Sequence, residues 1–405
     1  MKLGYAYSRY PVLSQTFCDA EMMELERRGF ELVLASMYPP KTPIRHEYLA
    51  RLGAKVQYAP EKSQLEKLMR KAKRKGRWPE QLVAAHEQKY GADYKAALRA
   101  GNALFFAGLF EDEGVRHFHV HFANRAAHTA LFVKAVTGMT FSITAHGQDF
   151  MTDLGSAELL CEICDAAEFV AAETNYSRDL LAKQCPSSAD KVLRVYNGID
   201  LAKFQTPVGR GRGGPIRLLS VGRLIAFKGF DVLIEACAEL QNRGADFSCE
   251  IIGEGDLREE LELRVAHHRL GKLVTFSGAQ SQDNVSAALR DCDIFVLASV
   301  TDERGASDVF PTVIAEAMAT GRPVVSTTTA GIPELVANGE TGVLVPPNDS
   351  HALADAIATL IVDAELRQSL GRAGRARIEQ HFTIENTIEP LIERFMTIHE
   401  RTQRR

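Results

Sequence analysis

The sequence predicts an α/β protein built from two doubly wound domains. Short β-branched apolar runs alternate with longer segments of helical periodicity along the chain, which is typical of parallel strands joined by right-handed helical crossovers. A chain of 405 residues is also too long for one ordinary core. Near its middle, the Gly- and Pro-rich stretch 201–216 has the composition of a linker.

We therefore expect a first domain over residues 1–200, a linker over 201–216, a second domain over 217–382 and a C-terminal helix over 383–405, with the two domains facing each other across a cleft. The N-terminus lacks an apolar signal region and is predicted to form the first strand. Further strands are predicted at Glu31–Ser36, Phe118–Phe122, Thr140–Ala145, Phe169–Ala172, Arg217–Val221, Ser248–Ile252, Ile294–Leu297 and Pro323–Thr327.

The composition is that of an ordinary globular protein, with 45% hydrophobic and 25% charged residues. A net charge of −4 argues against bulk nucleic-acid binding, and no apolar run is long enough to predict a membrane span. The seven cysteines lie in periodic apolar segments, which indicates reduced, buried thiols of a cytoplasmic protein. Cys161 and Cys164 are interpreted as packing residues rather than as a redox or zinc pair.

The strongest functional signal lies between Asp308 and Val325. Two carboxylates, Asp308 and Glu316, stand eight residues apart, and Pro311 lies between them. Pro is favoured at the first helical position, so we expect a helix to begin there, with Asp308 in the preceding loop and Glu316 about 1.5 turns inside. The free N–H groups of a helix tip attract phosphate or sugar oxygens, and two carboxylates suit a polyhydroxylated ligand. The alternative is a capping Asp and a solvated Glu.

A cationic loop is predicted after the first strand of the second half. Gly222 permits a tight turn there, and Arg223 and Lys228 follow at the carboxyl edge of the sheet, where open α/β sheets bind ligands. Two cations on one loop can clamp a diphosphate, with Arg as a fork and Lys as a point charge. The alternative is a pair of solvated surface cations.

Candidate residues in the first half also follow strands. His146 ends a strand and precedes a Gly, so we expect it to enter a ligand site. Asp149 could orient His146, contact a ligand or cap the next helix. Ser14, Gln15 and Thr16 lie at the predicted start of the first helix, where their hydroxyl and amide groups could bind a ligand or act as a plain cap.

Two sequence patterns match those of known kinds of metal site. His119 and His121 alternate within a predicted strand and so share one face, but no third ligand is evident, and we interpret them as structural or site-shaping. Asp291 and Asp293 form an Asp-x-Asp pair just before an apolar strand, and we interpret them as a helix end and a strand entry. A metal centre is the less favoured alternative for both pairs.

Taken together, these motifs resemble the retaining glycosyltransferases of the two-Rossmann-domain (GT-B) fold, family 4, in the branch that builds colanic-acid-type exopolysaccharides. The resemblance covers nearly the whole chain. Most members of the family have Glu where this chain has Asp308. The matching segments are Gly222-Arg223-Leu224 with Lys228-Gly229, Thr144-x-His146-Gly147-x-Asp149, Pro11-x-x-Ser14-Gln15-Thr16-Phe17 and the pair of carboxylates.

The resemblance implies roles for individual residues. Arg223 and Lys228 would hold the leaving diphosphate, and His146 would contact the transferred sugar. The implied catalytic residues are His146, Arg223, Lys228 and Asp308. The implied donor-binding residues are Arg223, Lys228, Gly278, Asp308, Phe310, Pro311, Thr312 and Glu316. The implied acceptor-binding residues are Ser14, Gln15, Thr16, His146 and Asp149. The resemblance also implies that the C-terminal helix crosses back to the first domain and that no metal or other cofactor is needed.

The predicted function is therefore that of a retaining, metal-independent hexosyltransferase. It would move a sugar from a nucleotide-diphosphate sugar to a polysaccharide or a lipid-linked oligosaccharide. A sugar-nucleotide epimerase of the same fold and a non-catalytic sugar-nucleotide binding protein are the alternatives. An NAD-dependent oxidoreductase is disfavoured because Gly253-x-Gly255 lacks the third Gly of the dinucleotide fingerprint.

A basic segment predicts a further partner. Residues 62–77 contain eight Lys or Arg and one acid, and Trp78 ends the run. The apolar residues of this segment follow helical spacing: Leu65, Leu68, Met69 and Ala72. Such a helix can lie on an anionic membrane surface, here the inner face of the cell membrane. The alternative is the solvated face of a packed helix.

Overall fold

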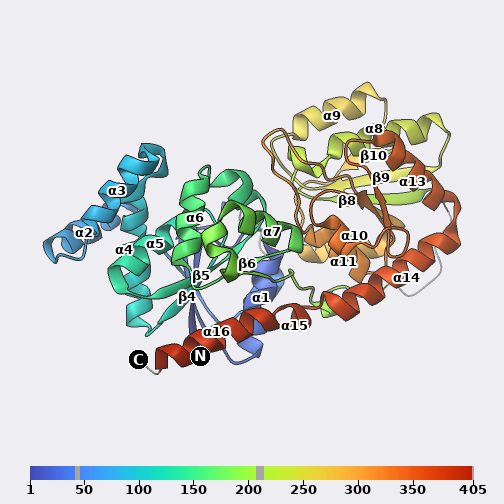
Figure 1. The fold of residues 1–405 in the computed structure, drawn as a ribbon. Helices are drawn as coiled ribbons and strands as arrows, with labels where there is room; N and C mark the ends of the chain where they lie inside the picture. Colours follow the sequence, from blue (N-terminus) through green and yellow to red (C-terminus); the bar gives the residue numbers. More distant parts are fainter. Residues whose placement is uncertain (42–45, 207–213, 404–405) are drawn as a thin grey trace. The chain divides into compact units, whose positions relative to one another are not determined.

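The computed structural model describes residues 1–41, 46–206 and 214–403 (Figure 1). The chain divides into two compact units, the first formed by Met1–Val195 and Ile388–Arg405 and the second by Tyr196–Thr387. The N-terminal segment of the first unit thus ends just before the predicted boundary at residue 200. Much of the predicted linker, residues 207–213, lies outside the described residues.

The first unit is built on a parallel sheet whose strands follow the order β3-β2-β1-β4-β5-β6-β7. Ala6 of β1 pairs with Ala35 on one side and Val120 on the other. The consecutive residues 3–7 of β1 are all buried, so this central strand is covered on both faces. The strands are β1 (Lys2–Arg9), β2 (Glu31–Tyr38), β3 (Val56–Tyr58), β4 (His117–His121), β5 (Thr140–Ala145), β6 (Val170–Ala172) and β7 (Val192–Arg194).

Helices connect these strands in the alternation expected from the sequence. Phe106, Phe110, Phe118 and Phe141 are fully buried where α4 meets the sheet. The α-helices are α1 (Thr16–Arg27), α2 (Lys62–Arg74), α3 (Glu80–Tyr90), α4 (Ala96–Asp112), α5 (Arg125–Thr137), α6 (Ala157–Ala166) and α7 (Asn175–Gln184). Short turns of other helix types are η1 (Glu47–Arg51), η2 (Ala92–Tyr94), η3 (Asp149–Asp153) and η4 (Pro186–Lys191).

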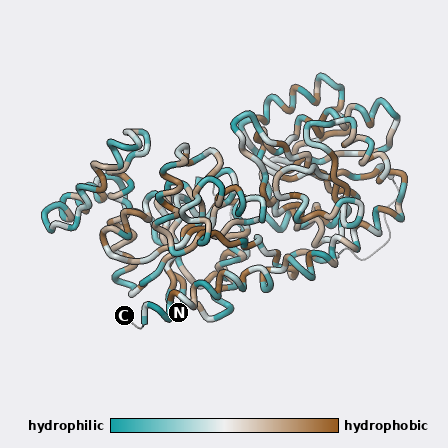
Figure 2. Tube along the Cα trace, in the orientation of Figure 1, coloured by the Kyte–Doolittle hydropathy of each residue, from teal (hydrophilic) through white to brown (hydrophobic). Residues whose placement is uncertain are grey.

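The second unit repeats the architecture with the strand order β10-β9-β8-β11-β12-β13, again parallel. Its strands are β8 (Ile216–Val221), β9 (Phe247–Ile252), β10 (Val274–Phe276), β11 (Ile294–Leu297), β12 (Val324–Thr327) and β13 (Val343–Val345). Its helices are η5 (Leu201–Lys203), η6 (Ala226–Lys228), α8 (Phe230–Asn242), α9 (Arg258–His267), α10 (Gln282–Asp291), α11 (Thr312–Ala319), α12 (Ile332–Leu335), α13 (Ser350–Val362), α14 (Ala364–His381) and α15 (Ile384–Thr387). Figure 2 shows hydrophobic residues concentrated in the strands at the centre of each unit.

The last helix, α16 (Glu389–Gln403), returns to the first unit, as the sequence analysis expected (Figure 1). Its buried Phe395 packs against Phe30 and His119, with ring centroids 6.4 and 5.4 Å away. Glu389 forms an ion pair with Arg28 of α1 over 2.7 Å. The chain therefore closes the first unit with its own C-terminus.

One expectation about cysteine chemistry is wrong. Cys161 of α6 and Cys185, which follows α7, form a disulfide, so not all thiols are reduced. Spacing could not reveal this pair, because the two residues are 24 positions apart and belong to different helical segments. Cys164 is buried and free, so the Cys-x-x-Cys spelling is not a bonded pair. Within the described residues, no helix has the length and apolarity that crossing a membrane requires.

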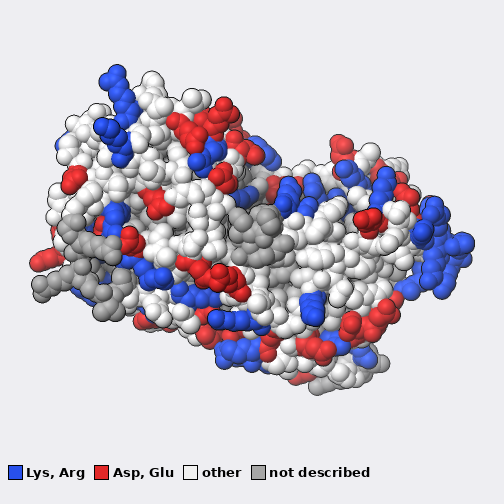
Figure 3. Space-filling model, turned by 180° about the vertical axis from the view of Figure 1, so that it is seen from behind, with Lys and Arg blue, Asp and Glu red and all other residues white. Residues whose placement is uncertain are grey.

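The basic segment forms α2 as predicted, but its apolar stripe is already covered. Leu65 and Ala72 are buried, and Met69 packs against Gly101 of α4. Trp78 is also buried, with the Lys73 ammonium 5.2 Å from its ring centroid. The outer face is strongly cationic and forms a blue cluster at one edge of the molecule (Figure 3). Its exposed cations are Lys62, Lys67, Arg70, Lys71, Lys73, Arg74, Lys75 and Arg77.

Candidate active site

The second unit brings two predicted loops together at one point of its sheet. Strand order reverses between β8 and β11, and open α/β sheets bind ligands outside the carboxyl ends of the strands at such a switch point. The Arg223–Lys228 loop follows β8, and the loop that carries Asp308 follows β11. Gly229, at φ +64°, permits this approach, because an added Cβ would lie 1.9 Å from the carbonyl oxygen of Ala298.

Lys228 and Asp308 form an ion pair at this point. The Lys228 Nζ atom lies 2.5 Å from Asp308 Oδ2, which also accepts a hydrogen bond from Ser299 Oγ at 3.1 Å. The Lys228 side chain is therefore not a solvated surface cation. Asp308 is not a helix cap either: α11 begins at Thr312, Pro311 occupies the N-cap position, and no side-chain cap occurs there among the described residues. Pro311 starts the helix within the one-residue margin of such boundaries.

Glu316 lies inside α11 and is buried. Gln282 Nε2 donates to its Oε1 over 3.1 Å, and Lys203 Nζ donates to Gln282 Oε1 over 3.4 Å. Burial raises the pKa of Glu316 to about 7, although the Gln282 hydrogen bond and the Lys203 charge oppose the rise. A solvated Glu is thus the wrong interpretation, and the charge of Glu316 depends on pH near neutrality.

Three glycine turns follow β8, β9 and β10 at the same sheet edge. A Cβ on Gly253, at φ +152°, would lie 1.8 Å from the Gly222 carbonyl oxygen, and Gly253 N–H donates to the Gly278 carbonyl over 2.9 Å. The clash at Gly253 and the left-handed backbone of Gly278, at φ +69°, disfavour side chains at these two positions and leave backbone for a ligand to approach. Arg223 is exposed nearby, with its guanidinium 6.0 Å from the Phe227 ring centroid.

Phe310 contributes to the core. Its ring packs against Tyr196 and Phe382, with centroids 5.7 and 5.9 Å away. The side chain is buried, so donor contact at this position would have to come from the backbone. Thr312, by contrast, is only partly buried at the first turn of α11.

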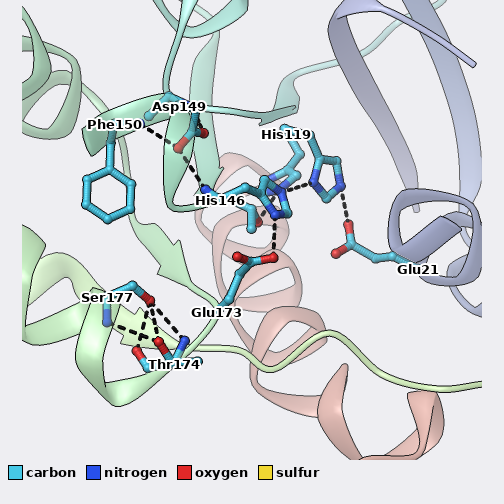
Figure 4. Close-up of polar contacts among 11 residues, drawn as sticks. Glu21, His119, His146, Asp149, Phe150, Glu173, Thr174 and Ser177 are labelled. Atoms are coloured by element: carbon cyan, nitrogen blue, oxygen red, sulfur yellow. Dashed lines mark hydrogen bonds and ion pairs between the residues drawn. The ribbon is translucent and has the colours of Figure 1, made fainter. Parts of the chain in front are cut away.

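In the first unit, His146 belongs to a buried chain of four ionisable side chains (Figure 4). Its Nδ1 lies 2.7 Å from Glu173 Oε1, and its Nε2 lies 2.9 Å from His121 Nδ1. His121 Nε2 lies 3.0 Å from Glu21 Oε1, which also accepts the Tyr5 hydroxyl at 2.5 Å. Burial, followed by the neighbouring His121, lowers the pKa of His146 to about 3. The ring is therefore uncharged, and both its nitrogens are bound to protein.

Asp149 holds the His146 loop in place. Its carboxylate accepts backbone N–H groups from Ala123, His146 and Phe150 over 2.5, 3.0 and 2.6 Å (Figure 4). Burial raises its pKa to about 6. Of its three predicted roles, orienting His146 fits this geometry: the side chain is 2% exposed and ties the loop after β4 to the loop after β5.

Glu21 of α1 is the third possible metal ligand that the sequence did not reveal. Its carboxylate oxygen and nitrogens of His119 and His121 lie within 4.8 Å of one another. The ligand atoms already have partners, however. His119 Nδ1 lies 2.8 Å from Ser142 Oγ, and its Nε2 lies 2.9 Å from Thr144 Oγ1. This arrangement fits a structural histidine, because a neutral imidazole with both nitrogens hydrogen-bonded offers no free lone pair.

The loop before α1 presents polar groups without capping the helix. Thr16 begins α1 and Gln15 occupies the N-cap position, where the described residues provide no side-chain cap. Ser14 is exposed, and the Gln15 Oε1 atom is buried with no hydrogen-bond partner within the described part of the chain. A plain cap is therefore the wrong interpretation of this loop.

The Asp-x-Asp pair lies at the opposite edge of the second sheet. Asp293 precedes β11 and accepts the Arg217 backbone N–H over 2.9 Å, and Arg217 also pairs with Asp291 over 2.6 Å. The pair is thus a helix end and strand entry, as interpreted. Sequence reasoning missed four polar partners: Glu21, Glu173, Gln282 and Ser299. A usable signal existed for Glu173, a carboxylate directly after a buried strand.

Comparison with known proteins identifies this architecture. Residues 205–377 match the family model "Glycosyl transferases group 1". The amylovoran biosynthesis glycosyltransferase AmsK of Erwinia amylovora is 29% identical over 94% of this chain and 96% of its own length. The putative colanic acid biosynthesis glycosyltransferase WcaL of Escherichia coli is 28% identical with the same coverage.

Solved structures share the fold at low identity. Anabaena HepE in complex with UDP and glucose aligns with a TM-score of 0.74 at 16% identity, over 98% of this chain and all of that one. The sucrose-phosphate synthase of Thermosynechococcus elongatus aligns with a TM-score of 0.73 at 18% identity, over 98% and 99%. The chain is therefore a glycosyltransferase of the GT-B fold that transfers sugar from a nucleotide-sugar donor.

Proposed function

We propose that this glycosyltransferase works with retention of anomeric configuration and without a metal ion, and that its acceptor is a growing exopolysaccharide or a lipid-linked oligosaccharide. The names of AmsK and WcaL, which match nearly full length, support the exopolysaccharide class. The observation that carries the donor assignment is the meeting of Lys228, Asp308 and Ser299 at the β8/β11 switch point.

Different residues of the second unit bind different parts of the donor. Lys228 and Arg223 neutralise the diphosphate, which removes the charge that a divalent cation would otherwise balance. Buried Glu316, in its ionised form, accepts two ribose hydroxyls. Asp308 leaves its ion pair to accept a hydroxyl of the transferred sugar once the diphosphate engages Lys228.

Retention follows from a same-face route. The bond between the anomeric carbon and the phosphate oxygen breaks, and the acceptor hydroxyl oxygen bonds to the same face of that carbon. The acceptor proton passes to the departing phosphate oxygen, so no enzymic nucleophile or base is needed. The buried first-unit carboxylates support this route, because Asp149 and Glu173 already have protein partners. His146, Asp149 and the Ser14–Thr16 loop would shape the acceptor and sugar side.

The cationic face of α2 suits docking on an anionic membrane at its inner leaflet. Its apolar stripe and Trp78 are covered by protein, so the attraction would be electrostatic rather than insertion of the helix. This placement favours a polyprenyl-linked acceptor.

A stereochemical experiment tests the proposal. Purified protein is first screened with UDP-, GDP- and ADP-sugars by thermal shift, since a bound donor raises the melting temperature. The stabilising donor is then incubated with an oligosaccharide acceptor, and the anomeric proton coupling of the product is read by NMR. Retained configuration supports the proposal, whereas an inverted product refutes the same-face route. An epimerised sugar formed from donor alone would instead identify an epimerase.

A further inference from the structure

A buried arginine in the first unit has no counter-ion among the residues that the structure describes. Arg99 lies on α4 and is 5% exposed, and its Nε and Nη1 atoms have no hydrogen-bond partner among the described residues. The groups that influence its charge are the Tyr38 hydroxyl and a second cation, Arg125. No carboxylate is among them. A guanidinium always carries its charge, and buried charges in proteins are paired, so this arrangement calls for a missing anion.

A second unpartnered donor lies one turn further along the same helix. Asn102 is 3% exposed, and its Nδ2 atom also lacks a partner within the described part of the chain. Positions i and i+3 of a helix share a face, so Asn102 and Arg99 project to the same side of α4. The three unsatisfied atoms are all N–H donors. What satisfies them must therefore offer several acceptor oxygens at once.

Two further cations, Arg125 and Arg9, lie near this position at the ligand-binding edge of the sheet. Tyr38 ends β2, and Arg9, which ends β1, places its guanidinium 5.2 Å from the Tyr38 ring centroid. Arg125 is exposed at the first position of α5, directly after the β4 loop. The strand order reverses between β1 and β4, so these residues lie at the switch point of the first unit.

We propose that Arg99 and Asn102 bind an oxyanion carried by the acceptor, either a phosphate of a lipid diphosphate or a carboxylate of an acidic sugar. This inference rests on the proposed function, because it names the chemical class of that acceptor. Arg99 presents donors in a fixed plane that matches either group, and Arg125 and Arg9 add positive charge nearby. The covered α2 helix packs on the same α4, at Gly101, so a phosphate at a membrane surface has a cationic approach.

The first test measures oxyanion binding and stability together. Arg99→Met keeps much of the side-chain length without its charge. The matched control is Arg394→Met, because Arg394 is an exposed residue of α16. Inorganic pyrophosphate and glucuronate are titrated into each protein by calorimetry. The Arg223–Lys228 loop of the second unit could also bind these probes, but it is unchanged in both variants. Any probe binding that is lost only in Arg99→Met therefore depends on Arg99. We expect binding of pyrophosphate, glucuronate or both to weaken roughly 10- to 100-fold.

The stability readout separates a binding role from a structural one. An uncompensated buried charge destabilises the native state, so the ligand-free Arg99→Met protein should melt at a higher temperature than wild type. A lower melting temperature with unchanged binding of both probes would overturn the proposal. If Arg99→Met fails to fold, exposed Arg125→Gln provides the second variant. It should fold normally and weaken the same probe, and unchanged binding there would also overturn the proposal.

The acceptor test identifies the source of the oxyanion. The same oligosaccharide is supplied as a short-chain prenyl diphosphate, with a terminal uronate, and as the neutral sugar. Arg99→Met should raise KM for one anionic acceptor and leave kcat and the neutral acceptor unchanged. The thermal shift caused by the nucleotide sugar should be retained. If wild-type protein showed no thermal shift with any nucleotide sugar, the donor assignment would be refuted instead. Failure of the oxyanion proposal and failure of the proposed function are therefore distinguishable.

Discussion

His146 Nε2 lies 2.9 Å from His121 Nδ1, and this contact joins two carboxylates, Glu173 and Glu21, through two imidazoles (Figure 4). The three hydrogen bonds of the chain need three protons, whereas two neutral imidazoles supply two. One further proton must be present. A proton shared at the contact between His121 Nε2 and Glu21 Oε1 completes the count. Burial raises the pKa of Glu21, but the contact with His121 outweighs this and leaves that pKa below its ordinary value.

Replacing Glu21 should destabilise the first unit strongly. Glu21→Gln removes the anion from a buried pair, for which a loss of about 3–5 kcal/mol in the free energy of unfolding is typical. Urea denaturation at pH 7 measures it. Because the folded pKa is depressed, this stabilisation is present above the unfolded value near 4.5 and is lost as the pH falls through the folded pKa. Glu31→Gln, an exposed partner of Lys2, should match wild type. Equal behaviour of the two variants would contradict the proton count.

Removing either cation of the β8 loop should abolish most turnover. Arg223→Ala and Lys228→Ala should each lower kcat by roughly 10²–10³-fold, the usual effect of deleting one electrostatic stabiliser of a leaving group. The fold should persist, because neither side chain lies in the core, and circular dichroism checks this. Lys272→Ala, a residue of the same unit outside the site, is the control. Near-normal turnover in both loop variants would mean that the diphosphate binds elsewhere.

Donor affinity should depend on pH through Glu316. Its pKa of about 7 means that the carboxylate is protonated progressively as the pH falls below 7, so donor binding should weaken toward pH 5.5. Calorimetry with the donor nucleotide measures this. In Glu316→Gln the affinity should be lower and flat across that range. The linkage has the opposite sign for stability: the folded state binds this proton more tightly, so the contribution is fully present below the unfolded value near 4.5 and is lost as the pH rises through 7.

Activity should survive EDTA. In the proposed donor site, the Lys228 and Arg223 side chains replace a diphosphate-bound cation. The Asp291–Asp293 pair is bound to Arg217 at the other sheet edge. Product formation is compared before and after chelation and after adding back Mn²⁺. Complete loss with EDTA and rescue by Mn²⁺ would refute metal independence.

The fold could be predicted from the sequence because its central strands are continuous apolar runs. The strands that were not predicted are β3, β7, β10 and β13, which form the outer edges of the two sheets. Each has three residues, too few to show a hydrophobic period. The Cys161–Cys185 disulfide could not be predicted from the sequence either, because only folding brings α6 and the end of α7 together.

The site could be predicted in part. Lys228 and Asp308 belong to motifs, the first expected at the carboxyl edge of the sheet and the second in the loop before a helix, and the two side chains meet in the structure. Partners supplied by other elements left no local pattern: Ser299, Gln282 and Glu21 come from separate loops and helices. Arg99 is the clearest case. Its charge within an otherwise apolar helical segment looks like a surface residue, and only its burial shows that it needs an anion.

The cationic face of α2 should bind anionic membranes by charge alone. Because Trp78 and the apolar stripe are buried, docking depends on exposed cations and is screened beyond about 8 Å at physiological ionic strength. Binding to phosphatidylglycerol liposomes should therefore fall steeply between low and high salt in a flotation assay. Replacing Arg70, Lys71, Arg74 and Lys75 by Gln should abolish this binding and leave donor binding intact, since the proposed donor site belongs to the second unit. Trp78→Phe should fold and bind as wild type, which an inserted Trp would not allow. Indifference of wild-type protein to these liposomes at low salt would show that α2 is a solvated face and favour a soluble acceptor.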